Sequence, residues 1–242
     1  MIRQIGNMKV FVGIISHLRS ENVPKMHNIV GENVTWVVGD NEKELYKHSG
    51  AKSIIEGGGL CESRNVILDV AQAQGADAAV ELSDDLKVIK LAVDKDNKNS
   101  KIISFDDAVS IMIEACIGLG AKMAGAAPTN NAFFFNPNKP YHTRAFIVGD
   151  FITVLDTNLR FDEKLKLKED YDYTLQHIYK YGSVARCNAI LASFLHRTNA
   201  GGACAYRNEK REQKAIRCLK AKWPNHIKDN PKRPNEILIK GF

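Results

Sequence analysis

Short apolar runs alternate with helical segments over the first ninety residues, and this alternation limits the folds open to the chain. Residues 9–16 and 34–40 are rich in β-forming residues and almost continuously apolar, as a strand buried on both faces requires. A third run covers residues 52–56, and a fourth ends at Asp84 and Asp85. Strands that alternate with helices predict an α/β fold with a mostly parallel central sheet flanked by helices and right-handed crossovers.

Length and composition indicate one globular domain. The chain has 242 residues, of which 44% are hydrophobic and 26% charged, so it can bury a substantial core. We expect a single domain in which about residues 8–90 form one half and about residues 91–205 the other. A basic C-terminal segment of about residues 206–242 follows.

Other global features bound the protein's environment. No run of eighteen apolar residues occurs, so no membrane span is expected. The first residues lack an apolar core of signal-peptide length, so secretion is not expected. Five scattered cysteines lack the spacing of a zinc site or a disulfide framework. We therefore expect a cytoplasmic protein.

The second half of the chain is less regular. Ser104 begins a predicted helix that runs to about residue 119, because it is a good N-cap and two aspartates follow it. Residues 122–127, 131–136 and 145–155 have strand composition. Further helices are predicted from the composition of residues 171–181 and 208–220.

Asp84 and Asp85 are the first candidates for chemistry. Carboxylates that follow a parallel strand lie where α/β sheets bind ligands. Hard oxygen ligands suit Mg²⁺ or Mn²⁺, and such ions commonly arrive with a phosphate-bearing substrate. The alternative is that both aspartates cap the following helix or turn.

A triple glycine precedes the helix predicted for residues 62–74. Backbone N–H groups beside Gly58 and Gly59 can approach a diphosphate closely, although the spacing matches neither the Rossmann nor the P-loop pattern. Arg64 is a candidate partner for phosphate or a sugar hydroxyl, and Asn65 for a directional contact. A flexible turn and a surface arginine are the alternatives.

Acidic residues cluster again at the start of the helix predicted near residue 171. Glu169, Asp170 and Asp172 are either surface charges favoured by the helix dipole or the source of a general base. His196 follows an apolar stretch and is a candidate third metal ligand beside Asp85, or a structural histidine.

Basic residues concentrate in the C-terminal segment. The net charge is +6, and the residues from Tyr206 onward hold eleven Lys or Arg against four Asp or Glu. Such a segment on a neutral body indicates a polyanionic partner such as nucleic acid. The alternative is the solvated face of an amphipathic helix with internal ion pairs. The predicted DNA-contacting residues are Arg207, Lys210, Arg211, Lys214 and Arg217.

Together these motifs resemble a glycosyltransferase of the GT-A fold. The resemblance implies a Rossmann-like first half that binds a nucleotide-sugar, most simply a UDP-sugar, with Mn²⁺ or Mg²⁺ at an Asp-x-Asp motif. Ser83 stands where an aspartate is common, so Asp85 is the expected metal ligand and Asp84 a ribose or water contact. Asp170, with Glu169 beside it, is the implied base. The implied donor-binding residues are Ser16, His17, Arg19, Asp40, Gly58, Gly59, Arg64, Asn65 and Asp84.

A more specific resemblance is to the phage glycosyltransferases associated with TET/JBP-type base hydroxylation. It is carried by the Gly-Gly-x-x-x-x-Ser-Arg-Asn pattern, by Ser-Asp-Asp after a strand, and by Glu-Asp-Tyr-Asp-Tyr with a later His-Arg-Thr-Asn-Ala-Gly-Gly. It implies transfer of a sugar to a hydroxymethylated pyrimidine in DNA, in the host cytoplasm for a phage-encoded protein. A base within a duplex then has to be flipped out.

Two alternatives stay open. A transferase of the same fold can act on a glycan, lipid or protein acceptor, with the basic segment meeting an anionic surface. A non-catalytic nucleic-acid-binding protein can also retain an α/β scaffold.

Overall fold

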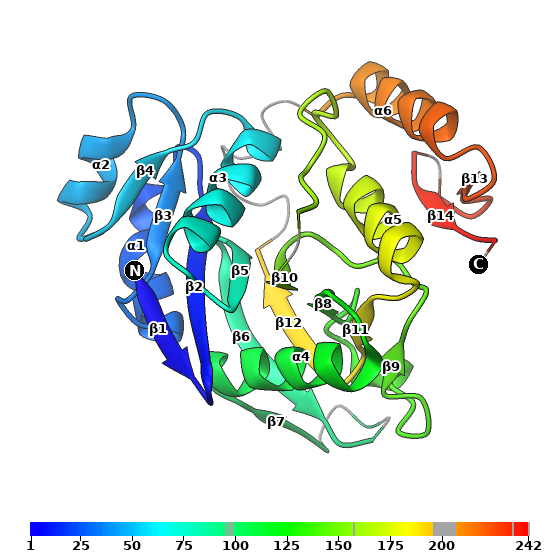
Figure 1. The fold of residues 1–242 in the computed structure, drawn as a ribbon, viewed down its shortest axis with the longest axis horizontal. Helices are drawn as coiled ribbons and strands as arrows, with labels where there is room; N and C mark the ends of the chain where they lie inside the picture. Colours follow the sequence, from blue (N-terminus) through cyan, green and yellow to red (C-terminus); the bar gives the residue numbers. More distant parts are fainter. Residues whose placement is uncertain (95, 97–98, 157, 196–206, 234, 242) are drawn as a thin grey trace.

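Four parallel strands form one half of the central sheet (Figure 1). The computed structural model describes residues 1–94, 96, 99–156, 158–195, 207–233 and 235–241. The four strands lie in the order β4 (Ile54–Glu56), β3 (Thr35–Val38), β2 (Met8–Ile15) and β5 (Ala78–Ser83). All three pairings between them are parallel. The four strands therefore end along the same edge of the sheet, which we call the carboxyl edge.

The other half of the sheet contains a reversed strand. β10 (Phe151–Leu155) lies antiparallel between β5 and β8 (Met123–Ala126), and β8 pairs in parallel with β11 (Ala185–Cys187). Short antiparallel strands β9 (Tyr141–His142) and β1 (Ile2–Ile5) pair with β11 and β2. Because β10 runs against β5, it begins at the carboxyl edge, where β5 ends.

Helices cover both faces of this sheet. α3 (Leu60–Ala73) and α5 (Glu169–Tyr181) share one apolar cluster with one face, and α1 (Val23–Val30) and α4 (Phe105–Leu119) share another with the opposite face. α2 (Lys43–His48) packs beside β4. In Figure 1 α3 and α5 both begin near the upper edge of the sheet, where the arrow of β3 ends. The first turns of both helices are thus brought to the carboxyl edge.

The alternation of side chains along β2 explains how the two faces are filled. Val10 and Val12 belong to the α1 and α4 cluster, whereas Phe11 belongs to the α3 and α5 cluster. At Gly13 a Cβ atom would lie only 2.4 Å from Cγ1 of Ile67 on α3. Glycine at this position therefore lets α3 approach the strand closely.

A second, smaller sheet begins directly after β5, which ends at the carboxyl edge. Its strands lie in the order β12 (Ile190–Phe194), β6 (Leu86–Ala92) and β7 (Ser100–Ile102), and all pairings are antiparallel. The chain passes directly from β5 of the central sheet to β6 of this sheet. The two residues of that turn are Asp84 and Asp85.

The basic C-terminal segment packs against α5. It contains α6 (Glu209–Lys222) and a hairpin of β13 (Ile227–Asp229) and β14 (Ile237–Ile239). Ile216 and Leu219 of α6 share an apolar cluster with Leu175 of α5. The segment is therefore packed onto the helix that begins at Glu169.

Most of the predicted architecture is confirmed. The fold is α/β with a mostly parallel central sheet flanked by helices, and Ser104 caps α4 through a capping box with Asp107. The strand predicted for residues 131–136 is wrong. That segment contains a 3₁₀ helix, η3 (Ala132–Phe134), because its buried anchors Ala132 and Phe135 are three residues apart rather than two.

Two other boundaries differ from the predictions. The strand expected over residues 145–155 begins only at Phe151, and β6 and β7 were not predicted.

None of the helices in the described part of the chain combines the length and apolar character needed to cross a bilayer.

Candidate active site

Asp84 and Asp85 form the turn between the two sheets rather than the cap of a helix. Their residues are only 3% and 8% exposed, so both carboxylates need compensating partners. Asp84 accepts hydrogen bonds from Ser16 Oγ and from Arg19 Nη1, the latter at 3.1 Å. Both partners follow β2, the neighbouring parallel strand. The carboxyl ends of β2 and β5 therefore build one polar site.

A buried tyrosine orders the hydrogen bonds around Asp84. The hydroxyl of Tyr46 lies 2.5 Å from Ser16 Oγ and accepts a hydrogen bond from the backbone N–H of Arg19. Burial raises the pKa of Tyr46 to about 12, so its hydroxyl stays protonated. Since Ser16 donates its proton to Asp84, Tyr46 donates to Ser16 Oγ.

The pKa of Asp84 is raised to about 6, mainly by burial. The hydrogen bond from Ser16 and the charge of Arg19 oppose this effect, and the charge of Asp85 adds to it. Oδ2 of Asp85 lies 3.9 Å from Arg19 Nη1. Two carboxylates thus share one buried arginine, an arrangement that an additional cation would relieve.

The predicted metal site is only partly within the described structure. The backbone carbonyl of Asp85 accepts a hydrogen bond from Leu195 N at 3.1 Å, so the end of β12 lies beside the turn. His196, the predicted third ligand, lies outside the described residues. Within the ranges described, no three His, Cys, Asp or Glu side chains are grouped to hold a metal ion. Two adjacent carboxylate groups nevertheless suit a Mg²⁺ or Mn²⁺ ion that takes its other ligands from water and phosphate.

The loops after β2 and β3 meet beside the turn of Asp84 and Asp85. Nδ1 of His17 contacts Oε1 of Glu42, and Leu18 N donates to Oε2 of Glu42 at 2.8 Å. Leu18 and Asn41 both have positive φ angles, of 55° and 66°. Strained residues in two adjacent loops are a feature of binding sites. Asp40, a predicted donor contact, is exposed at this place.

The glycine triplet forms the entry to α3. At Gly57 a Cβ atom would lie 2.4 Å from Val37 Cγ1 and 3.0 Å from the Cα atom of Ser63, so the packing of this turn requires glycine. Gly58 has φ +75° and is exposed, and Gly59 is the N-cap of α3. A backbone of this kind at a helix N-terminus suits an anion, and diphosphate binding here stays a prediction.

Arg64 is buried and bonds to three protein acceptors. Its Nη1 donates to Glu81 at 2.7 Å, its Nε to Glu169 at 3.2 Å, and its Nη2 to the carbonyl of Gly149 at 3.0 Å. The guanidinium also lies 5.1 Å from the ring centroid of Phe161. This is the geometry of a residue that holds three segments together. Its predicted contact with phosphate remains untested.

Asn65 is similarly occupied. Its amide accepts from Phe161 N at 2.8 Å and donates to Phe161 O at 3.0 Å and to Glu163 at 2.9 Å. These bonds attach the segment before α5 to α3. Its role in donor binding also stays a prediction.

Asp170 also contacts Gly149, through the backbone N–H rather than through the carbonyl that Arg64 binds. Its Oδ2 accepts from Gly149 N at 3.2 Å and its Oδ1 from Tyr171 N at 3.0 Å. Burial raises its pKa to about 7; the charge of Glu169 adds to this, and that of Arg64 opposes it. Lys168, the N-cap before this pair, has a left-handed backbone with φ 62°. A carboxylate with a pKa near neutrality is suited to general base catalysis.

The three acidic residues at the start of α5 have separate environments. Asp172 is fully buried and accepts from Trp223 Nε1 at 2.7 Å, and it pairs with Lys222 Nζ at 2.9 Å. Glu169 pairs with Arg64. Asp172 therefore anchors the C-terminal segment, whereas Asp170 faces the residues at the start of β10.

Asp150 connects the two acidic sites, and it was not among the predicted residues. Its backbone carbonyl accepts from Ser83 N at 2.9 Å, and its Oδ1 accepts from Ser83 Oγ at 3.2 Å. Its charge also contributes to the raised pKa of Asp170. The segment Gly149 and Asp150 thus lies between Asp170 and the turn that begins after Ser83.

Glu81 was also missed. It is fully buried in β5, burial raises its pKa to about 7 despite the opposing charge of Arg64, and among the described residues its Oε1 has no hydrogen-bond partner. The available signal was a carboxylate within an apolar strand, which requires a buried cation. For Asp150 the comparable signal was a Gly-Asp pair directly before an apolar strand.

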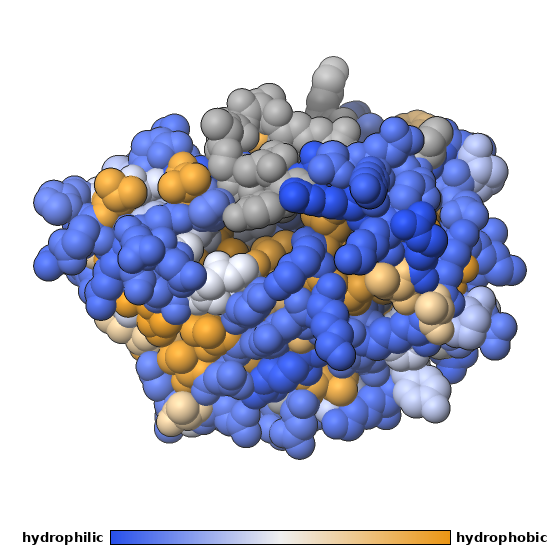
Figure 2. Space-filling view, turned by 90° about the horizontal axis from the view of Figure 1, so that it is seen from above, coloured by the Kyte–Doolittle hydropathy of each residue, from blue (hydrophilic) through white to orange (hydrophobic). Residues whose placement is uncertain are grey.

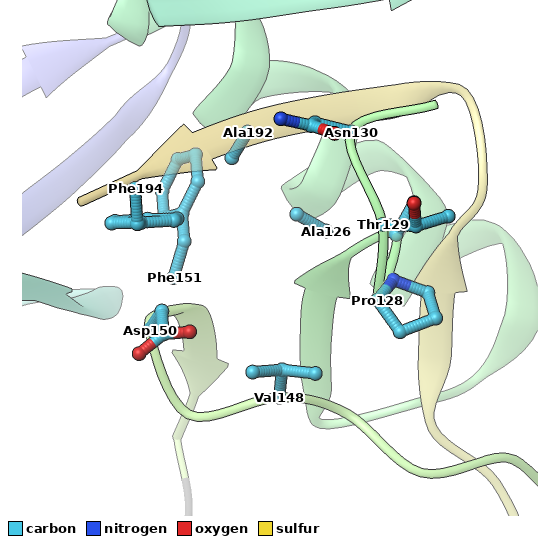
Figure 3. Close-up of a pocket in the computed structure, with 10 residues that line it drawn as sticks. Ala126, Pro128, Thr129, Asn130, Val148, Asp150, Phe151, Ala192 and Phe194 are labelled. Carbon is cyan, nitrogen blue, oxygen red and sulfur yellow. The ribbon is translucent and has the colours of Figure 1, made fainter. Parts of the chain in front are cut away.

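A cavity of about 260 Å³ adjoins Asp150 (Figure 3). Its walls come from the segment after β8, the residues around the start of β10, and the end of β12. It therefore lies next to the segment that links Ser83 with Asp170.

The predicted DNA-contacting residues lie on or just before α6. Residues 207, 210, 211, 214 and 217 are all exposed. Arg207 pairs with Glu212, which also pairs with Lys168 at 2.7 Å. α6 is at the top right of Figure 1, on the side from which Figure 2 is seen, and hydrophilic residues dominate that face. Both ion pairs join Glu212 of α6 to a residue outside the helix, so the predicted alternative of ion pairs within the helix is not what these contacts show.

No family model matches the chain, and no curated protein matches it in sequence. Solved structures with a similar arrangement include A197 from STIV, with a TM-score of 0.44, 10% identity, and coverage of 96% of this chain and 94% of that one. S. aureus TarS 1-349 in complex with UDP has a TM-score of 0.42 and 13% identity, and the match covers 73% of this chain and 57% of that chain. A cytidylyltransferase from Leptospira borgpetersenii serovar Hardjo-bovis has a TM-score of 0.43 and 11% identity, covering 89% and 95%.

Proposed function

We propose that the protein is a glycosyltransferase that uses a nucleotide-sugar donor. The observation that carries this proposal is the arrangement of two acidic sites at the carboxyl edge. One is the buried turn of Asp84 and Asp85 beside Arg19. The other is Asp170, whose pKa of about 7 suits a base. The segment of Gly149 and Asp150 contacts both sites.

The donor occupies the ends of the parallel strands. Its nucleotide lies against the loops of Ser16, His17, Arg19 and Asp40, and its diphosphate approaches Gly58 and Gly59. Asp85, with Asp84 beside it and His196 as a further ligand, would hold Mg²⁺ or Mn²⁺. When bound, the ion supplies positive charge against the leaving diphosphate. Arg64 positions Glu169 and Gly149 rather than carrying the reaction itself.

Asp170 carries the proton transfer. The acceptor oxygen forms a bond to C1 of the sugar as the bond from C1 to the diphosphate oxygen breaks. The electron pair leaves with the nucleoside diphosphate, and the hydroxyl proton passes to Asp170. This direct displacement inverts the anomeric centre. The pKa near 7 keeps a large fraction of Asp170 ionised at neutral pH while leaving it basic enough to accept a proton.

The proposed acceptor is a hydroxymethylated pyrimidine in DNA. Lys210, Lys214 and Arg217 are spaced three and four residues apart on α6, so they share one exposed face. Cations in such a row bind phosphates without reading sequence. α6 packs against α5, which begins at the proposed base, so DNA bound there lies on the same side of the molecule.

A screen of nucleotide-sugars against hydroxymethylated DNA, unmodified DNA and simple sugars tests the proposal. Nucleoside mass spectrometry identifies the transferred sugar and the base together. Transfer to hydroxymethylated DNA alone is expected. Transfer only to sugars, lipids or proteins would retain the transferase and reject the DNA acceptor.

Two variants test the metal site. Asp85→Ala should abolish transfer that depends on Mn²⁺. The control is Asp106→Ala, which removes an exposed carboxylate of α4 that pairs with Arg3 and should leave transfer unchanged. Unchanged turnover in Asp85→Ala rejects the assignment of Asp85 as the metal ligand.

A non-catalytic DNA-binding protein would instead show no thermal shift with nucleotide-sugar and Mn²⁺, since a ligand must bind the folded state to stabilise it.

A further inference from the structure

The cavity beside Asp150 has walls suited to a flat ring. Phe194 and Pro128 stand on opposite sides of the opening in Figure 3, and Val148 closes a third side. Thr129, Asn130 and Asp150 are its polar side chains. A pyrimidine base has two apolar faces and a polar edge, which matches this distribution.

The size of the cavity limits its occupant to a single small ring with its substituents. Its volume of about 260 Å³ lies just below the range of about 300–1,000 Å³ that is usual for drug-sized ligands. A base that is still stacked and paired in a duplex does not enter such a space. A nucleobase that occupies the cavity therefore has to be unpaired.

Two exposed aromatic residues stand close to the cavity. Phe133 and Phe134 are 65% and 69% exposed, and their ring centroids are 5.4 Å apart with the ring planes at 88°. The two rings therefore offer faces in different directions. Both lie within four residues of Asn130 along the chain, so Phe133 is at most about 11 Å from it. They are held in place because Ala132 and Phe135 are buried on either side and Asn131 caps the turn. Exposed aromatic rings on a rigid turn are a stacking platform for single-stranded nucleic acid.

We propose that this cavity binds one unstacked pyrimidine base of the acceptor strand, while Phe133 and Phe134 stack against neighbouring bases. The proposal rests on the DNA acceptor of the proposed function. Nδ2 of Asn130 donates one hydrogen bond to Ser193 Oγ at 3.1 Å. Its second N–H and its carbonyl oxygen suit the polar edge of either pyrimidine. The hydroxymethyl group then points towards Asp150, which adjoins Ser83 and, through Gly149, Asp170.

Binding of dye-labelled oligonucleotides, measured by fluorescence anisotropy without a donor, tests the aromatic platform. We expect a single strand with one 5-hydroxymethylcytosine to bind more tightly than the same strand in a duplex. The double variant Phe133→Ser with Phe134→Ser should weaken single-strand binding by about 5- to 100-fold, as loss of base stacking does. The control Ile117→Ser removes an exposed apolar side chain of α4 and should leave binding unchanged. Equal weakening by both, or no weakening by the double variant, overturns the proposal.

The cavity itself is tested with an abasic site. Wild-type protein should bind a strand with an abasic residue at the modified position more weakly, and Ala192→Leu, which narrows the cavity, should remove that difference. If Ala192→Leu fails to fold, Asn130→Ala tests the same cavity by removing the amide that binds the polar edge of the base, and it should reduce that difference. If the base and the abasic site bind equally to wild-type protein, or if free glucose displaces the oligonucleotide, the cavity does not hold a base.

These measurements separate failure of the inference from failure of the proposed function. Thermal shift with UDP-sugars and Mn²⁺ reports donor binding and involves neither Asn130 nor Phe133. If UDP-sugars do not bind, but the protein still binds the strand with the base more tightly than the abasic strand, the glycosyltransferase is rejected and the base site is kept. Donor binding without base discrimination rejects the base site alone.

Discussion

Asp170→Asn should make the protein more stable and inactive at the same time. Burial raises the pKa of Asp170 from 3.8 to about 7, so the folded state holds this proton more tightly than the unfolded state does. Between these two pKa values the folded state binds more protons, and the stability of the wild-type protein falls as pH rises. Above about pH 7 the charged carboxylate is fully present, and its burial cost reaches its maximum.

The size of the effect follows from the pKa. At about 1.4 kcal/mol for each tenfold change in proton affinity, the full cost above pH 7 is at most about 4 kcal/mol. Relaxation and residual solvent around the carboxylate reduce this, so we expect about 1–3 kcal/mol. Asparagine keeps the acceptor for Gly149 N or Tyr171 N and removes the charge. Its stabilisation should therefore grow by about 2 kcal/mol between pH 5 and pH 8.

Urea unfolding at pH 5, 6, 7 and 8 measures this difference directly. Asp172→Asn is the matched control, since Asp172 lies on the same turn of α5 but bonds to Trp223 and Lys222, so its substitution should destabilise the protein at neutral pH. Activity of Asp170→Asn should fall by about 10²–10⁴-fold, the usual contribution of a general base. The burial argument is refuted if the difference in unfolding free energy between Asp170→Asn and wild type does not change with pH. It is also refuted if Asp170→Asn is less stable than wild type at pH 8.

Three further predictions concern other parts of the structure. Arg64→Met should cost about 3–5 kcal/mol in urea unfolding, because it leaves two buried carboxylates without their cation; a loss below about 1 kcal/mol would contradict this role of Arg64. Gly13→Ala should cost about 1–3 kcal/mol, because its Cβ meets Ile67, and Ile67→Ala in the same chain should recover part of that loss. Lys214→Gln should lower the slope of log Kd for DNA against log salt by about 1, and an unchanged slope would remove this side chain from the DNA contact.

Much of the fold follows from local sequence pattern. The continuous apolar runs before Ser16, Asp40 and Asp84 identify strands buried on both faces, and parallel strands end at a common edge. The turn of Asp84 and Asp85 was therefore predictable as a polar site at that edge. The residues 131–136 show where local pattern fails: their aromatic content resembles a strand, yet packing buries two anchors at a spacing of three.

Tertiary structure decided which polar residues of a motif face one another. Glu169, Asp170 and Asp172 are neighbours in sequence and carry the same carboxylate group. Only the fold gives them separate partners, in Arg64, Gly149 and Trp223. The same holds for Arg64. The sequence predicted a phosphate contact, with a surface arginine as the alternative, whereas the fold makes Arg64 the buried link between α3, β5 and α5.

The sequence by itself determined the α/β class, the ends of the parallel strands, and the basic character of α6, because strand periodicity and charge are local properties. The tertiary structure alone decided that reversed strand β10 brings Asp150 to Ser83, and that Asp170 lies on the other side of Gly149. Contacts of this kind join residues that are far apart along the chain. They depend on strand order and burial, and no local pattern encodes either.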